Sequence, residues 1–232
     1  MRVAIVENTK ITHLGQVGVA LAEAGVMIEI FRPYLDGFLP DPQGDYAGLV
    51  VLGGEQSAVD DETHPYLPAL AREMKRFDEA GRSVLGICLG AQLLARAWGA
   101  AHHVGTSREF GWQIIETTEA AANDPVFRTV PPSFPSFEWH SDHYALPDGA
   151  TRLAANDTAP NQAFSIGARS WGMQFHFEVS RAVAAAWNRR FPREVEARHP
   201  GWLEEFDSLA SRHAPASDAA GLALARAWVA QL

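Results

Sequence analysis

The first half of the chain alternates short apolar runs with longer segments in which apolar residues recur every three or four positions. The short runs have the length of buried strands, and the periodic segments predict helices, two of which stop at a glycine. Strands that are apolar on both faces and alternate with helices indicate a parallel sheet covered by helices. The predicted strands are 3–6, 27–31, 48–52 and 83–87, and the predicted helices are 14–24, 67–80 and 90–98.

The second half has a different pattern. Shorter apolar runs separated by turn residues indicate an antiparallel or mixed strand region, and helical patterns return near the C-terminus. We expect PPSFP (131–135) to form a rigid turn or loop and RHAPASD (212–218) to separate the last two helices. Because no linker divides the chain, we expect one domain over 1–232, with a core at about 1–185 and C-terminal helices at about 182–232. The strands predicted here are 111–115, 137–139, 151–155, 163–166 and 171–175, and the helices are 182–191, 202–211 and 218–231.

Composition and charge argue against several classes of protein. The chain has 28 acidic and 19 basic residues and a formal net charge of −9, which is unlike the positive surface that nucleic-acid binding requires. A single cysteine excludes an intramolecular disulfide. Only a short apolar run precedes Glu7, too short for a signal peptide, and no apolar stretch approaches the roughly 18 residues of a membrane span. We therefore expect a soluble cytoplasmic protein without nucleic-acid or membrane partners.

The single cysteine lies on a sharp predicted turn. In SVLGICLGAQLLARAWG (83–99), an apolar strand leads through Gly86, Cys88 and Gly90 into a helix. This arrangement is typical of a nucleophile elbow, in which small flanking residues avoid clashes in a strained backbone. The positive end of the helix dipole favours the thiolate form of a cysteine placed there. The alternative is a buried structural cysteine, because a free cysteine packs as a small apolar residue.

A candidate base for the thiol lies in WGMQFHFEVS (171–180), which predicts an apolar strand ending at His176. Residues i and i+2 of a strand share a face, so Glu178 can reach the far ring nitrogen of His176 and hold the tautomer that accepts a thiol proton. Cys88, His176 and Glu178 are therefore a candidate nucleophile, base and orienting group. A local pair of His176 with Glu178 and no chemistry is the alternative.

Two further patterns bear on the site. Gly53 and Gly54 follow a predicted strand at its carboxyl end, where ligands bind in open α/β sheets, and their N–H groups could form an oxyanion hole with the amide of Leu89. An ordinary Gly-Gly turn is the alternative. Several histidines lack a surrounding ligand set at zinc-like spacing, so we expect no metal site and no cofactor. These histidines are His102, His103, His140 and His143.

Together the segments LGG (52–54), GICLGAQLLA (86–95) and QFHFEVS (174–180) resemble the class I glutamine amidotransferase family in order and separation. SREFGW (107–112) and WHSDHY (139–144) are similar to segments of the amidotransferase domain of GMP synthetase. The resemblance covers roughly residues 1–185. It implies a flavodoxin-like α/β fold with a mostly parallel sheet, and hydrolysis of the glutamine carboxamide through a cysteine γ-glutamyl thioester.

The resemblance also implies roles for individual residues. Cys88 would be the nucleophile, His176 the general base and then acid, and Glu178 its orienting group. The backbone N–H groups of Gly54 and Leu89 would bind the oxyanion. The remaining positions carried over are Gln92 as a substrate contact, and Glu109 and Asp142 as substrate or wall contacts.

Two departures from the family pattern stand out. Many members have proline between the histidine and the glutamate, whereas this chain has Phe177, whose side chain we expect to point away from both neighbours. The chain also has no Gly-rich phosphate loop, so an ammonia acceptor, if one exists, must lie on another protein, such as a partner synthetase. The alternatives to a glutamine amidotransferase are a γ-glutamyl peptide or amide hydrolase with the same triad, and a non-catalytic regulatory module.

Overall fold

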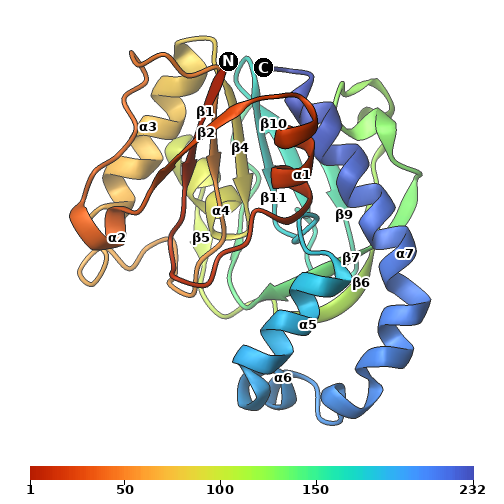
Figure 1. Cartoon of the computed structure of the whole chain (residues 1–232). Coiled ribbons are helices and arrows are strands. Elements are labelled where there is room, and N and C mark those ends of the chain that lie inside the picture. The colour runs from red at the N-terminus through yellow and green to blue at the C-terminus, as the bar shows by residue number, and fades with distance from the viewer.

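The computed structural model describes residues 1–232, and a nine-stranded sheet forms its centre (Figure 1). Neighbouring strands run parallel in the order β2 (Met27–Phe31), β1 (Arg2–Val6), β3 (Gly48–Val51), β4 (Ser83–Ile87) and β11 (Ser170–Met173). The sheet continues through antiparallel pairings to β10 (Ala163–Ile166), β9 (Thr151–Ala155), β6 (Glu109–Thr117) and β7 (Ser133–His140). A separate antiparallel pair joins β5 (His102–His103) to β8 (His143–Tyr144). The predicted parallel sheet with an added antiparallel region is confirmed.

Helices cover both faces of the parallel part because its strands are apolar on both sides. Val3 and Ile5 of β1 pack in one core with α1 (Gly15–Glu23) and the end of α7 (Trp202–Val229). Ala4 and Val6 point to the opposite face and pack with α3 (Leu67–Glu79) and α4 (Leu89–Ala97). This is the expected flavodoxin-like arrangement, with helices on both sides of the sheet. The shorter elements are α2 (Pro33–Asp36) and the 3₁₀ helices η1 (Glu119–Asn123) and η2 (Phe127–Thr129).

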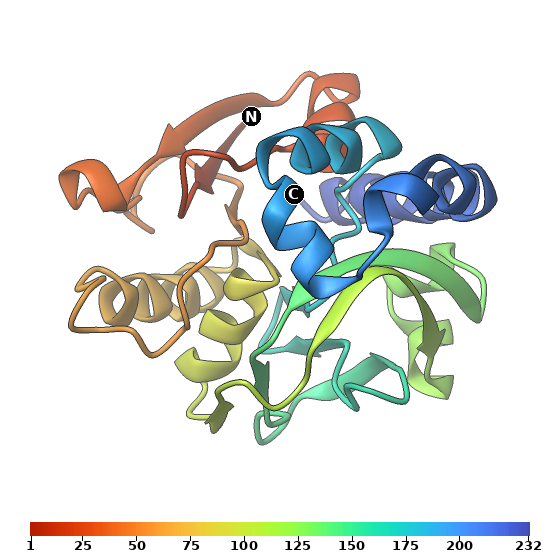
Figure 2. The ribbon, with the colours of Figure 1, turned by 90° about the horizontal axis from the view of Figure 1, so that it is seen from below.

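Two helices lie beyond the carboxyl ends of the parallel strands, at the lower end of the molecule in Figure 1 and toward the viewer in Figure 2. They are α5 (Arg181–Arg190) and α6 (Pro192–Arg198). An aromatic cluster that includes Phe110, Phe137 and Trp202 packs between them, β6, β7 and the start of α7. The C-terminal helices therefore wrap around the edge of the sheet at which a parallel α/β fold binds its ligands.

The C-terminal helical region is confirmed, but the predicted break at 212–218 is wrong. The chain forms one helix, α7, of 28 residues that passes through Pro215. A proline inside a helix removes one backbone hydrogen bond and crowds the preceding turn. The buried face of α7 continues across that position through Ala214 and Ser217 to Leu224, and this packing outweighs the local cost. Neither α7 nor any other helix of the chain is long and apolar enough to cross a membrane.

The segment 131–135 is not the predicted turn or loop, because β7 begins at Ser133 and includes Pro135. Pro135 is opposite Ile114 of β6. Since β7 is the last strand of the sheet, its outer edge needs no ladder hydrogen bond from the missing proline N–H. A proline-rich segment that reads as a loop is therefore the start of an edge strand.

Two glycines let helices approach the segment that carries His176 and Glu178. A Cβ at Gly15, which has φ of +46°, would overlap the Glu178 carbonyl oxygen, and a Cβ at Gly221 would overlap the Phe177 carbonyl oxygen. The Gln16 N–H donates to the same Glu178 oxygen at 2.9 Å. Helices α1 and α7 thus hold this segment by direct backbone contact, which only glycine permits.

We expect Gly221→Ala to destabilise the protein by about 1–3 kcal/mol, since the added methyl group forces Phe177 or α7 to move. The sign of this change tests the contact, because replacing glycine by alanine at an open helix position stabilises a protein by about 1 kcal/mol. Urea unfolding followed by circular dichroism measures the change, with Ser208→Ala, on an exposed part of α7, as the matched control. A Gly221→Ala chain as stable as the original would contradict the close contact.

Candidate active site

Cys88 lies on a strained turn between β4 and α4. Its φ of 52° and ψ of −108° make it the single non-glycine residue with a positive φ. A Cβ at Gly86 would overlap the Gly90 carbonyl, and a Cβ at Gly90 would overlap the Val51 carbonyl oxygen. Strain of this kind is held only where the surrounding structure determines the backbone, and it concentrates at functional sites. The turn therefore has the geometry of the predicted nucleophile elbow.

His176 and Glu178 form a short, buried pair beside Cys88. The Nδ1 atom of His176 lies 2.6 Å from Oε1 of Glu178, and both side chains are less than one tenth exposed. Gly53 lies next to both His176 and Cys88, because a Cβ at this position would be 3.0 Å from His176 Cε1 and 3.6 Å from Cys88 Cβ. Cys88, His176 and Glu178 are thus brought together as the sequence predicts.

Charge stabilises the protonated form of this histidine. Burial disfavours the imidazolium ion, but Glu178 and then Cys88 outweigh it and raise the pKa of His176 well above its ordinary value. An imidazolium placed between a carboxylate and a thiol is suited to a thiolate–imidazolium pair.

The backbone around this pair differs from the prediction. The strand predicted to run to Phe175 ends at Met173, and the pair lies in a turn closed by the Val179 N–H, which donates to the His176 carbonyl at 3.1 Å. An isolated bridge to β7 fixes the start of this turn, because the His176 N–H donates to the Phe137 carbonyl at 2.8 Å. His176 and Glu178 are therefore paired by a turn, and not by the alternation of a strand that the sequence predicts. Phe177, between them, points into the apolar core.

The glycine pair after β3 leaves backbone donors free. The N–H groups of Gly53 and Gly54 have no acceptor within the chain. Leu89 is the first residue of α4, where N–H groups lack intrahelical partners. The Asn8 side chain holds the residue before the glycine pair by donating to the Leu52 carbonyl at 2.8 Å. Gly54 also lies close to Leu89, because a Cβ at Gly54 would come within 2.7 Å of the Leu89 side chain. These positions suit donors aimed at a developing oxyanion.

A cavity of about 710 Å³ opens onto Cys88. Its size falls within the range of small-molecule sites. Glu109 is the one predicted site residue that does not line it. The predicted residues that do are Gly53, Gly54, Cys88, Leu89, Gln92, Asp142, His176 and Glu178.

The outer wall of the cavity contains two tryptophans for which the sequence alone favours packing over a pocket, and other residues that the sequence does not single out. Trp139 on β7, Trp187 on α5, and Phe191 and Arg198 around α6 line it, together with His13 from the loop after β1. The rings of Trp139 and Trp187 meet edge to face with centroids 5.4 Å apart. The high tryptophan content was a signal for an aromatic wall, but α6 has too short a pattern to be predicted.

Asp142 presents a fixed negative charge to the cavity. Its carboxylate accepts from the Ser57 hydroxyl at 2.6 Å and the Gly105 N–H at 2.9 Å, and lies 2.9 Å from His102 Nε2. Burial works against the charged form, but these partners outweigh it and lower the pKa of Asp142 below its ordinary value. Gln92 donates to the Asp142 carbonyl at 3.3 Å, which links the helix after Cys88 to this loop.

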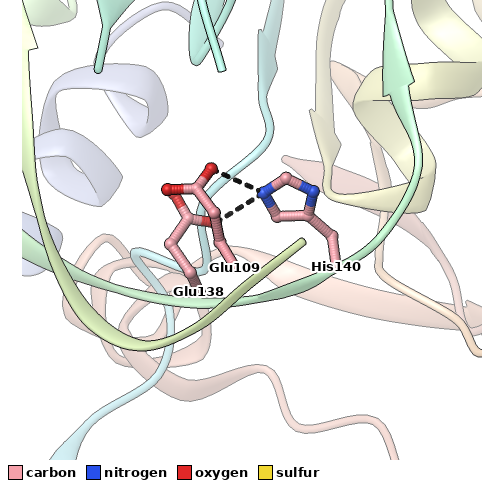
Figure 3. Close-up of side chains that lie close together, drawn as sticks. All are labelled: Glu109, Glu138 and His140. Atoms are coloured by element: carbon pink, nitrogen blue, oxygen red, sulfur yellow. Dashed lines mark hydrogen bonds and ion pairs between the residues drawn. The ribbon is translucent and has the colours of Figure 1, made fainter. Parts of the chain in front are cut away.

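Glu109 does not line the cavity but lies in a buried polar cluster with Glu138 and His140 (Figure 3). Its carboxylate is 3.0 Å from His140 Nε2 and accepts from Gln162 at 2.7 Å. Glu138 is fully buried beside it; burial, and then Glu109, raise the pKa of Glu138 well above its ordinary value. His143 is buried nearby, and burial lowers the pKa of His143 to about 4, so its ring is neutral at pH 7.

The chain matches known proteins over most of its length. The family model described as glutamine amidotransferase class-I matches residues 16–187. The chain belongs to the class I glutamine amidotransferase family. It is 31% identical over 210 residues to the glutamine amidotransferase-like protein YfeJ of Salmonella typhimurium, a match that covers 84% of this chain and 88% of that protein. It is 33% identical over 160 residues to the GMP synthase of Thermomicrobium roseum, which covers 68% of this chain and 28% of that longer protein.

Solved structures of amidotransferases match almost the whole chain. A glutamine amidotransferase from Thermotoga maritima has a TM-score of 0.86 at 26% identity, with 98% of both chains covered. A glutamine amidotransferase from Methylobacillus flagellatus has a TM-score of 0.85 at 26% identity, with 100% of this chain and 95% of that chain covered. Because these matches extend beyond the family model, the region of α5 to α7 also has counterparts in amidotransferase structures.

The strain at Cys88 predicts an unusual effect of glycine. We expect Cys88→Gly to be more stable than Cys88→Ala by about 1 kcal/mol, because glycine adopts a positive φ without strain. Both variants lose the thiol, so alanine is the matched control for its removal. Urea unfolding of the two chains measures the difference, and a less stable glycine variant would show that the turn is unstrained.

Proposed function

We propose that this amidotransferase-family chain hydrolyses the side-chain carboxamide of glutamine through a thioester on Cys88, and that the ammonia is used by an acceptor on another protein. The observation that carries the proposal is the constellation at one end of the cavity. A cysteine on a strained turn lies beside an imidazole whose far nitrogen is 2.6 Å from a buried carboxylate. Such a nucleophile, base and orienting group is the arrangement that acyl transfer requires.

The proposed reaction has two halves. The Cys88 thiolate attacks the carboxamide carbon, and the N–H groups of Gly54 and Leu89 stabilise the oxyanion. The His176 imidazolium donates its proton to the leaving nitrogen as the carbon–nitrogen bond breaks, so ammonia leaves and a γ-glutamyl thioester remains. His176, now neutral, takes a proton from water, and the resulting hydroxide displaces Cys88 to give glutamate.

The other end of the substrate would meet the polar wall of the cavity. The carboxylate of Asp142 has the charge that suits the α-ammonium group of glutamine, and Gln92 borders the same region. Glu109 supports this wall through His140 rather than contacting substrate. A partner synthetase is supported by the similarity to a GMP synthase in which the matched part is 28% of the length.

A second candidate is favoured by the outer wall of the cavity. The space continues from Cys88 to Trp187, Phe191 and Arg198. This wall could receive the leaving group of a γ-glutamyl peptide or amide, for which water is the only acceptor. The two candidates share their thioester chemistry and differ in the leaving group.

Replacing Cys88 by alanine should reduce glutamine hydrolysis at least about 10³-fold and leave folding nearly intact. Glutamate release from glutamine and from a panel of γ-glutamyl peptides and amines, measured as kcat/KM, tests both candidates at once. Retained turnover in Cys88→Ala refutes the thioester mechanism. A strong preference for bulky leaving groups replaces the first candidate by the second.

Replacing Glu178 by glutamine should move the alkaline limb of the pH dependence of kcat/KM to lower pH. Glu178 is the main group that raises the pKa of His176, so without its charge the imidazolium loses its proton at lower pH. Glu178→Gln should also slow turnover less than His176→Ala does. Glu204→Gln, at an exposed position of α7, is the control of equal charge change. An unmoved alkaline limb would contradict the role of Glu178.

A further inference from the structure

We propose that Glu109, Glu138 and His140 form a binding site for one Zn²⁺ ion at the inner side of the cavity wall, to which His140 belongs. The three side chains point toward one another in Figure 3, and one ligand atom from each lies within 4.8 Å of the others. Their side chains are between 0% and 3% exposed. The proposal concerns a site separate from Cys88 and does not depend on the function proposed above.

The antiparallel pairing of β6 with β7 creates the cluster. Glu109 is directly opposite His140, and Glu138 precedes His140 by two residues, so both β7 side chains lie on the same face as Glu109. The neighbouring residues Phe137 and Trp139 point to the opposite face and join the aromatic packing. The cluster is thus fixed by strand register on two rigid strands.

The distances suit a tetrahedral ion. His140 Nε2 is 3.0 Å from Glu109 Oε2 and 3.4 Å from Glu138 Oε2. Zinc bonds to nitrogen and oxygen of about 2.0–2.1 Å place two ligand atoms of a tetrahedron about 3.3 Å apart. Both separations from His140 are close to that value.

Glu138 is the observation that points to a cation. Both of its carboxylate oxygens are buried without a hydrogen-bond partner, and it adjoins a second carboxylate, Glu109. A buried carboxyl group is neutralised either by a proton or by a compensating cation. A divalent cation between the two carboxylates compensates both charges at once.

The tautomer of His140 fits the same interpretation. Its Nδ1 atom lies 3.0 Å from the Asp142 carbonyl oxygen, which can only accept, so Nδ1 carries the proton. In the neutral ring, Nε2 then presents a lone pair toward the two carboxylates, where a cation belongs. A histidine ligand that donates its other ring N–H to a carbonyl is the usual outer contact of a zinc site.

The carboxylate of Glu109 has similar outer contacts. It accepts from Asn156 Nδ2 at 2.6 Å and from Gln162 Nε2 at 2.7 Å, which orient it toward His140. The side-chain oxygen of Gln162 is itself buried without a partner. Ligand spacing along the chain predicts no metal site. These three ligands instead come from two strands and are brought together by the register of β6 with β7.

The test uses the full chain with Cys88→Ala, so that the thiol cannot hold zinc. After treatment with a chelator and its removal, titration calorimetry with Zn²⁺ should give one site per chain, and thermal unfolding should occur a few degrees higher with zinc. Glu138→Gln, which keeps the shape of the side chain, should weaken binding at least tenfold. Glu116→Gln, an exposed position on β6, should change it less than twofold.

A second readout needs no further substitution. Co²⁺ added to the Cys88→Ala chain should produce the visible absorption of a tetrahedral nitrogen and oxygen site, and Zn²⁺ should displace it. Absence of binding to the Cys88→Ala chain, or binding that Glu138→Gln leaves unchanged, would overturn the proposal. These outcomes are independent of glutamine turnover, so they do not bear on the function proposed for Cys88.

Discussion

The parallel pairing of β4 with β11 is the constraint on which the rest of the site depends. Ile87 is opposite Met173, and the Cys88 N–H donates to the Met173 carbonyl at 2.8 Å. The chain after each strand therefore emerges at the same edge of the sheet, Cys88 from one and His176 from the other. Because strand register is set by buried apolar residues on both faces, a slip of one residue would reverse the faces of the strand and separate the two groups.

Buried polar bonds then hold the parts of this edge in place. Gln92, on the helix after Cys88, donates to Gln174 Oε1 at 3.1 Å and to the Asp142 carbonyl. One side chain thus connects the cysteine turn, the segment before His176 and the loop of Asp142. Buried polar groups cost free energy unless they are paired, so these bonds select one arrangement of the three segments. The strain at Cys88, of about 1–3 kcal/mol, is sustained by this surrounding structure.

The sequence predicts features whose cause is local. Strands such as 83–87 are apolar on both faces, and the turn at Cys88 is marked by the small residues its backbone requires. The sequence does not predict features that are determined by a tertiary contact. The strand before His176 stops early because the chain turns to bridge Phe137, and α7 continues through Pro215 because its buried face is continuous. The partners of Glu138 are set by the register of β6 with β7, which no spacing along the chain reveals.

Strand β7 connects the candidate site to the C-terminal helices. Its outward residues, Phe137 and Trp139, pack with the aromatic cluster, while Glu138 and His140 face inward. Arg198 of α6 donates to the His140 carbonyl at 3.2 Å, and the His140 ring lies 3.0 Å from the Asp142 carbonyl. The wall that would receive a leaving group and the loop that would hold the substrate ammonium are therefore attached to the same residue. The contacts of His140 thus join the buried cluster to α6 on one side and to the Asp142 loop on the other.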